Sequence, residues 1–115
     1  MAVSEVGGAG DLQPGTMRPV QAAGHDLLLA RVGDQYYAAE RHCPHLGGDL
    51  AAGRLAGTVV TCPRHGSQFD LADGRVVRWT NWTGLKLALA RRYKRPRPLR
   101  TYPVRIEKGR MLVDL

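Results

Sequence analysis

Residues 43–48 read Cys-Pro-His-Leu-Gly-Gly, and residues 62–67 read Cys-Pro-Arg-His-Gly-Ser. These segments contain the only two cysteines of the chain and two of its four histidines, in the pairs Cys43 with His45 and Cys62 with His65. Thiolate sulfur and imidazole nitrogen are ligands of zinc and of iron-sulfur clusters. The two segments therefore predict a metal centre held by two loops.

The distribution of these ligands bears on which metal is bound. Classical zinc fingers place both cysteines on one hairpin and both histidines on one helix, whereas here each loop carries one of each. That arrangement suits two loops that face each other across a two-iron core, although a tetrahedral zinc site remains an alternative. A disulfide or two buried thiols is the ordinary alternative for a lone cysteine pair. The other histidines, His25 and His42, are predicted to be surface or loop residues.

The two segments resemble the cluster-binding loops of the Rieske family, which read Cys-x-His and, after a similar gap, Cys-x-x-His, with glycine after the ligands. Leu46-Gly47-Gly48 and Gly66-Ser67-Gln68-Phe69-Asp70 fit the same loops. The resemblance covers roughly residues 17–77 and 98–115. It implies one Rieske 2Fe-2S cluster, with Cys43 and Cys62 on the inner iron and His45 and His65 on the outer iron.

The resemblance also implies which residues surround the cluster, namely Leu46, Gly66, Ser67 and Phe69. In the high-potential respiratory and photosynthetic members, a serine and a tyrosine donate hydrogen bonds to cluster sulfur. Ser67 matches that serine, but Phe69 stands at the place of the tyrosine. Those members also join their loops by a disulfide, at places that correspond here to Gly48 and Arg64. These departures favour the ferredoxin branch and a low to intermediate reduction potential.

The rest of the chain predicts an all-β fold. Short runs rich in β-branched, aromatic and other apolar residues between turn residues predict strands at 17–20, 27–32, 35–40, 58–61, 68–71, 104–107 and 111–115. Gly33-Asp34 and Lys108-Gly109 predict tight hairpin turns. Strands of this length and spacing indicate an antiparallel sandwich or barrel, here of the Rieske type, with the cluster-binding loops at about 41–75.

The exception is a basic insertion at about 79–98. Leu85, Ala88 and Leu89 recur at helical spacing, which predicts one short helix there. Residues 79–115 hold ten of the seventeen Lys and Arg residues and only two acidic residues. Arg91, Arg92, Lys94 and Arg95 are candidates for docking an acidic redox partner. The alternatives are a solvated face, or a peripheral membrane contact that uses Trp79 and Trp82.

Length and composition are those of one ordinary domain spanning residues 1–115. The chain is 43% hydrophobic and 23% charged, with a net charge of +7. No apolar run reaches the ~18 residues of a membrane-spanning helix. The start of the chain does not read as a secretory signal, so a cytoplasmic location is expected. Nucleic-acid binding is not expected, because nothing resembles a base-reading module.

Together these observations predict a one-electron carrier and not an enzyme. The resemblance implies transfer from a flavin reductase to a terminal oxygenase. Oxygenase catalytic subunits add a mononuclear iron held by two histidines and a carboxylate, and only His25 and His42 remain here in a chain too short for that domain. The alternatives are a small subunit of a larger redox enzyme, such as an assimilatory nitrite reductase, and a zinc-stabilised binding module.

Overall fold

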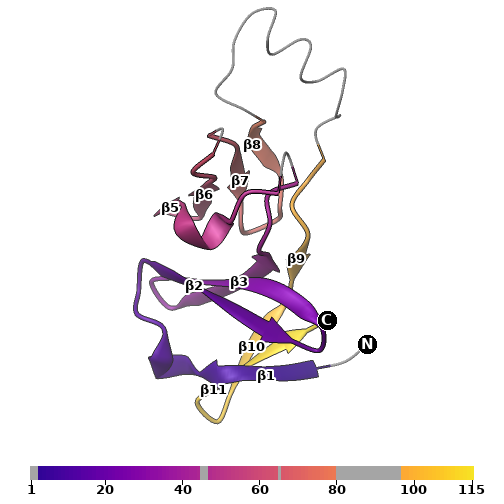
Figure 1. The fold of residues 1–115 in the computed structure, drawn as a ribbon. Coiled ribbons are helices and arrows are strands. Elements are labelled where there is room, and N and C mark those ends of the chain that lie inside the picture. Colours follow the sequence, from indigo (N-terminus) through magenta and orange to yellow (C-terminus); the bar gives the residue numbers. More distant parts are fainter. Residues whose placement is uncertain (1–2, 45–46, 65, 80–96) are drawn as a thin grey trace, which may run out of the picture.

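The computed structural model describes residues 3–44, 47–64, 66–79 and 97–115, and within them nearly all regular structure is β (Figure 1). The strands are β1 (Val3–Gly8), β2 (Thr16–Ala22), β3 (His25–Val32), β4 (Gln35–Glu40), β5 (Arg54–Ala56), β6 (Val59–Thr61), β7 (Gln68–Asp70), β8 (Val76–Arg78), β9 (Thr101–Tyr102), β10 (Val104–Glu107) and β11 (Arg110–Asp114). Two single-turn 3-10 helices, η1 (Ala9–Asp11) and η2 (Leu50–Ala52), complete the described elements.

The strands form three antiparallel sheets. Their strand orders are β1-β11-β10, β2-β3-β4-β9 and β5-β6-β7-β8. In Figure 1 the β5–β8 sheet lies above the other two, and β9 runs down from its side to join β4. The all-β antiparallel architecture expected from the sequence is therefore confirmed.

Strand β3 contributes to both hydrophobic cores, because successive strand residues point to opposite faces. Leu27 and Leu29 pack into one core with Met111 of β11, while Leu28 and Ala30 pack into the other core with both cysteines. All four of these β3 residues are at most 1% exposed. This double burial explains the uninterrupted apolar run of β3, since neither face is left for water.

The β5–β8 sheet has one buried face and one polar face. Leu55, Val60, Phe69 and Val76 are cross-strand neighbours, and they belong to or pack against the core that contains the cysteines. Arg54, Thr61, Gln68 and Arg78 form the next cross-strand row. Because the side-chain period of a strand is two, that second row points away from the core.

Each predicted strand matches an observed strand, with small shifts of its ends. The sequence did not predict β1, β5, β8 and β9. The helix predicted within 79–98 falls almost wholly on residues 80–96, which lie outside the described residues. Among the described residues, no helix is long and apolar enough to cross a membrane.

Candidate metal centre

The first cysteine loop is closed by two backbone hydrogen bonds. The N–H of Cys43 donates to the carbonyl of Gly48 (2.7 Å), and the N–H of Gly47 donates to the carbonyl of Cys43 (2.7 Å). Gly47 has a φ of 75°, in the left-handed region that glycine adopts without a steric penalty. The backbone thus turns back on itself directly after the predicted ligands.

The second loop repeats this pattern at the same offsets from its cysteine. The N–H of Cys62 donates to the carbonyl of Ser67 (2.8 Å), and the N–H of Gly66 donates to the carbonyl of Cys62 (3.2 Å). Gly66 has a φ of 69° and occupies the place that Gly47 has in the first loop. Two different sequences therefore build the same loop around each cysteine.

The two loops meet at Gly48. A Cβ atom placed on Gly48 would lie 2.7 Å from Cys62 Sγ and 3.1 Å from two carbons of the Arg64 side chain. Gly48 also accepts the hydrogen bond from Cys43, so it links the backbone of one loop to the thiol of the other. Gly48 and Arg64, the positions that the resemblance relates to the inter-loop disulfide of the high-potential members, therefore lie next to each other.

Both cysteines are buried at 3% exposure in the same core, and no disulfide joins them. The alternative of a structural disulfide is therefore wrong for this structure. A buried cysteine pair on facing loops suits the inner half of a metal centre, because thiolate is a soft, charged ligand. The absence of a side chain at Gly48 leaves room beside Cys62 Sγ, so the described half of the site fits a cluster.

An ion pair fixes the stem of the first loop. Arg41 donates from Nε and Nη2 to the two carboxylate oxygens of Asp49, at 3.0 and 2.9 Å. Asp49 also accepts from the N–H of Ala51 (3.0 Å) and so caps η2. The hydrogen bond from Arg41 holds the pKa of the Asp49 carboxyl below its ordinary value, against the opposing effect of burial.

A second carboxylate, Glu40, connects the first loop to the chain that returns at residue 97. Arg97 donates to both carboxylate oxygens (3.0 and 2.8 Å), and the N–H of Arg100 donates to Oε2 (2.7 Å). Burial acts to raise the pKa of Glu40, but the hydrogen bonds from Arg97 and Arg100 outweigh it and keep the pKa below the ordinary value. This carboxylate is therefore ionised at neutral pH.

The second loop is held by hydrogen bonds to backbone carbonyls and by burial, and no carboxylate takes part in these described contacts. Ser67 is fully buried, and its hydroxyl donates to the carbonyl of Trp79. The family pattern implied that this hydroxyl donates to cluster sulfur, but a hydroxyl has only one hydrogen, and in this structure the carbonyl receives it. Arg78 Nε donates to the carbonyl of Gly66 (2.9 Å). The Phe69 ring packs edge-on against Trp79, with ring centroids 6.3 Å apart.

Several predicted site residues lie outside the described residues. They are His45, Leu46, His65, Arg91, Arg92, Lys94 and Arg95. The prediction of a membrane contact through Trp79 is wrong, because Trp79 is 2% exposed and packed in the core. Trp82 lies outside the described residues.

The two histidines that are not assigned as ligands make their described side-chain contacts with residues other than the cysteines. His42 is exposed, and its Nε2 lies 3.6 Å from a carboxylate oxygen of Asp26. His25 is also exposed and packs edge-on against Tyr102. Both agree with the expectation of surface or loop positions.

Comparison with known proteins identifies the family. The sequence matches the Rieske [2Fe-2S] domain over residues 2–103. The chain belongs to the Rieske family. It is 30% identical over 115 residues to the ferredoxin component of biphenyl 2,3-dioxygenase from Rhodococcus jostii (strain RHA1), a match that covers 100% of this chain and 94% of that protein.

Two further comparisons point to the same branch of the Rieske family. The chain is 46% identical over 67 residues to the ferredoxin CarAc of Metapseudomonas resinovorans, which covers 57% of this chain and 63% of that protein. Its fold is similar to a chain in the complex of reduced oxygenase and oxidized ferredoxin in carbazole 1,9a-dioxygenase, with a TM-score of 0.78, 33% identity, and 96% and 91% of the two chains covered.

These findings confirm the prediction of a Rieske ferredoxin with a single 2Fe-2S cluster. They also confirm an electron carrier and not an enzyme. The alternative of a zinc-stabilised binding module is therefore wrong. Sequence reasoning missed the supports of the loops, namely the Arg41–Asp49 pair and the contacts of Glu40 with Arg97. The equal offsets of Gly47 and Gly66 from their cysteines were a readable signal for the shared loop geometry.

Proposed function

We propose that this Rieske ferredoxin holds its cluster through Cys43, His45, Cys62 and His65, with Cys43 and Cys62 on the inner iron. One observation supports this assignment above the others: the identical backbone hydrogen bonding around two buried cysteines on facing loops. When bound, the cluster supplies one-electron chemistry, and its two neutral imidazole ligands raise its potential relative to an all-cysteine cluster. Leu46, Gly66, Ser67 and Phe69 belong to the shell around it.

The ligand assignment can be tested by exchanging single residues. The wild-type protein should contain about two irons and two acid-labile sulfides, and on reduction should give a rhombic electron paramagnetic resonance spectrum with an average g below that of all-cysteine clusters. His65→Cys and His45→Cys should change that spectrum, because a charged thiolate replaces a neutral ligand. His42→Cys is the matched control and should leave it unchanged. A spectrum altered by His42→Cys alone would overturn the assignment.

For the partners, the proposal is that the chain accepts electrons from a flavin reductase and passes them to a terminal oxygenase. Relatives that are ferredoxin components of biphenyl and naphthalene dioxygenases support this role. The proposal includes a cytoplasmic location, one domain over residues 1–115, and steering of the partner by Arg91, Arg92, Lys94 and Arg95. A small permanent subunit of a larger redox enzyme has no specific observation in its favour.

The carrier role between these partners is testable with purified components. The reduced protein, mixed with an oxidised Rieske terminal oxygenase, should be reoxidised within the turnover time of that oxygenase. An NADH-dependent flavin reductase should then reduce it again. Reduction by the flavoprotein without any transfer to an oxygenase would contradict the proposal and favour a different acceptor.

A further inference from the structure

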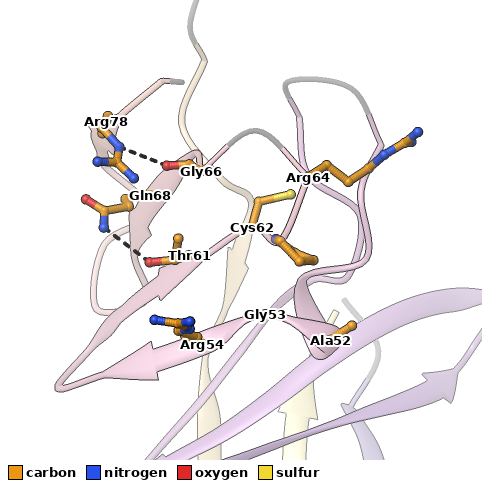
Figure 2. A pocket seen from close by; sticks show the side chains of 10 residues that line it. Ala52, Gly53, Arg54, Thr61, Cys62, Arg64, Gly66, Gln68 and Arg78 are labelled. Atoms are coloured by element: carbon orange, nitrogen blue, oxygen red, sulfur yellow. Dashed lines mark hydrogen bonds between the residues drawn. The ribbon is translucent and has the colours of Figure 1, made fainter. Parts of the chain in front are cut away.

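A polar groove borders the second cysteine loop (Figure 2). It has a volume of about 460 Å³, and strands β5 to β8 form its floor on the face that points away from the core. At one end it reaches Cys62, Pro63 and Gly66 of the loop. The groove is therefore a surface feature that lies directly against a proposed ligand of the cluster.

The floor of the groove is one row of cross-strand neighbours. Arg54 pairs with Thr61, Thr61 with Gln68, and Gln68 with Arg78. Gln68 Nε2 donates to Thr61 Oγ1 (3.2 Å), so the two central side chains form a neutral bridge between an arginine on each edge strand. In Figure 2 Arg54 and Arg78 lie on the same side as this bridge, while the Arg64 side chain extends away from it.

The charged residues that line this groove are all basic. No Asp or Glu lines it among the described residues, and neither Arg54 nor Arg78 lies within 4.0 Å of a described carboxylate. Most other described arginines do have such a neighbour, namely Arg31, Arg41, Arg75, Arg97, Arg105 and Arg110. The groove thus places Arg54 and Arg78 on one surface, and no carboxylate of the described residues neutralises either of them.

We propose that this groove receives an acidic segment of the protein that exchanges electrons with the chain. The proposal rests on the electron-carrier function proposed above and names the chemistry of its partner surface. An arginine fork matches the geometry of a carboxylate, and the amide and hydroxyl of Gln68 and Thr61 can donate to or accept from a peptide backbone between the two forks.

The position of Arg78 adds orientation to charge. Its Nε donates to the carbonyl of Gly66 at 2.9 Å, which fixes the plane of the guanidinium relative to the second loop. A carboxylate bound to this guanidinium is therefore held at a fixed position relative to the loop of Cys62. Docking in the groove would bring the partner's surface next to the second cysteine loop, which is proposed to hold the cluster.

Binding of a defined probe tests the proposal without any redox partner. The probe is acetylated and amidated hexaglutamate with a fluorescent label, and binding to the cluster-loaded chain is followed by anisotropy at low and physiological salt. Hexaglutamine with the same label is the neutral control. Arg54→Glu is the test variant, because Arg54 is exposed and makes no described contact that a substitution would break.

Arg105→Glu is the matched control, because it reverses an exposed arginine on a strand of another sheet. At physiological salt, exposed charges separated by more than the Debye length of about 8 Å are screened, so under that condition the control should change the affinity less than about twofold. Arg54→Glu should weaken the affinity by about tenfold, since it replaces an attraction with a like-charge contact. The visible absorption of both variants must match that of the wild type.

Each alternative gives a distinct result. Equal loss in both variants would show a net-charge effect and overturn the proposal. A loss of peptide affinity that occurs only when Arg91, Arg92, Lys94 and Arg95 are replaced together would also overturn the proposal. Displacement of the peptide by inorganic phosphate of equal charge concentration, or tighter binding of a short single-stranded DNA that Arg54→Glu abolishes, would assign the groove to another ligand class.

A last measurement separates this proposal from the carrier function itself. With a purified Rieske terminal oxygenase, Arg54→Glu should slow reoxidation of the reduced chain and flatten its salt dependence. Normal reoxidation with unchanged salt dependence would overturn the docking proposal and leave the carrier function intact. An absence of electron transfer in the wild type, with peptide binding still sensitive to Arg54, would contradict the carrier function only.

Discussion

The two cysteine loops share one backbone geometry but are held in place by different forces. In each loop the cysteine N–H bonds to a carbonyl five residues later, and a glycine N–H four residues later bonds back to the cysteine carbonyl. The first loop is anchored by ionised carboxylates, Asp49 and Glu40. The second is anchored by Ser67, by the Arg78 contact and by burial.

The cysteine and glycine positions of the loop are therefore dictated by the ligands, whereas its supports come from the surrounding residues. The position of the cysteine and of the left-handed glycine is common to both loops. The supports differ between the loops. The ion pairs of the first loop are weakened by salt and by protonation of their carboxylates, whereas the buried hydrogen bond of Ser67 in the second loop is not.

The largest effect is expected from removal of a thiol. Cys43→Ser and Cys62→Ser should each lose most of the iron and reduce the yield of folded protein, because cluster binding and folding are coupled. Since the two loops are equivalent in geometry, the two losses should be similar. Iron and labile-sulfide analysis with the visible spectrum measures both. Full iron content in Cys43→Ser would show that this cysteine is not a ligand.

The next effect concerns the contact between the loops. Gly48→Ala places a methyl group 2.7 Å from Cys62 Sγ. Overpacking of this kind costs about 1–3 kcal/mol of unfolding free energy, and here it should also lower cluster content. Gly10→Ala is the control, because a Cβ there meets no atom within 4 Å. Equal stability of both variants by thermal unfolding would mean that the loops separate more easily than the structure indicates.

Ser67→Ala tests the neutral anchor of the second loop. It removes the donor to the Trp79 carbonyl, which should cost about 1–2 kcal/mol because a buried hydrogen bond is lost. The reduction potential should move little, since the hydroxyl hydrogen is directed to that carbonyl. Urea denaturation and voltammetry measure the two quantities. A fall of tens of millivolts without loss of stability would show that the hydroxyl serves a sulfur atom instead.

Glu40→Gln tests the charged anchor of the first loop. At neutral pH it should lower the unfolding free energy by about 1 kcal/mol, because the two-oxygen pairing with Arg97 is weakened and partly exposed pairs are screened. In the folded state the pKa of Glu40 lies below its ordinary value of 4.5. The contribution of the Glu40 charge to the unfolding free energy is therefore complete above pH 4.5, and it is lost as the pH falls through the lower pKa of the folded state.

The wild type and Glu40→Gln should therefore differ at pH 7 and converge in acid. Thermal unfolding as a function of pH follows this difference, with the exposed Glu107→Gln as control. Ser67→Ala should keep its deficit over the same pH range, which separates the two anchors. A Glu40→Gln deficit that persists below the folded pKa would show that the side chain acts by packing and not by charge.

Local patterns predicted much of the fold and the ligand set. The strands 27–32 and 35–40 were predictable because apolar and aromatic residues lie between clear turns, and the ligand spacing is contained in two short segments. Strands β5 and β8 were not predictable, because each has three residues and includes an arginine. Their strand conformation follows from pairing with β6 and β7, which a local pattern does not contain.

The supports of the site depend on contacts between distant parts of the chain. Glu40 and Arg97 are separated by 57 residues, and no pairing rule connects them in the sequence. The row from Arg54 to Arg78 depends on the register of three strand pairs, where a shift by one residue would turn these side chains into the core. Such features follow only from the assembled sheets.

The smallest effect is expected from Phe69→Tyr, which adds one hydroxyl to a buried ring. Phe69 is fully buried, with Val60 and Val76 as its cross-strand neighbours. It points into the core that also contains Cys43 and Cys62, so an added hydroxyl enters the apolar region around the proposed inner ligands. Burying a hydroxyl in that apolar region costs free energy unless the hydroxyl donates a hydrogen bond, and cysteine sulfur can accept one.

A donor directed at cysteine sulfur stabilises the reduced cluster more than the oxidised one, because the reduced cluster carries one more negative charge. A differential of ~1 kcal/mol corresponds to roughly 40 mV for a one-electron couple, so Phe69→Tyr should raise the potential by tens of millivolts. Tyr36→Phe is the control, because Tyr36 lies on β4 in a different sheet from Phe69, its hydroxyl donates to the carbonyl of Ala9 in η1, and its removal should leave the potential unchanged. Protein-film voltammetry compares the two variants. A potential that is unchanged or lower in Phe69→Tyr would mean that a hydroxyl at position 69 does not reach a cysteine sulfur, and would contradict the placement of Phe69 beside the cluster.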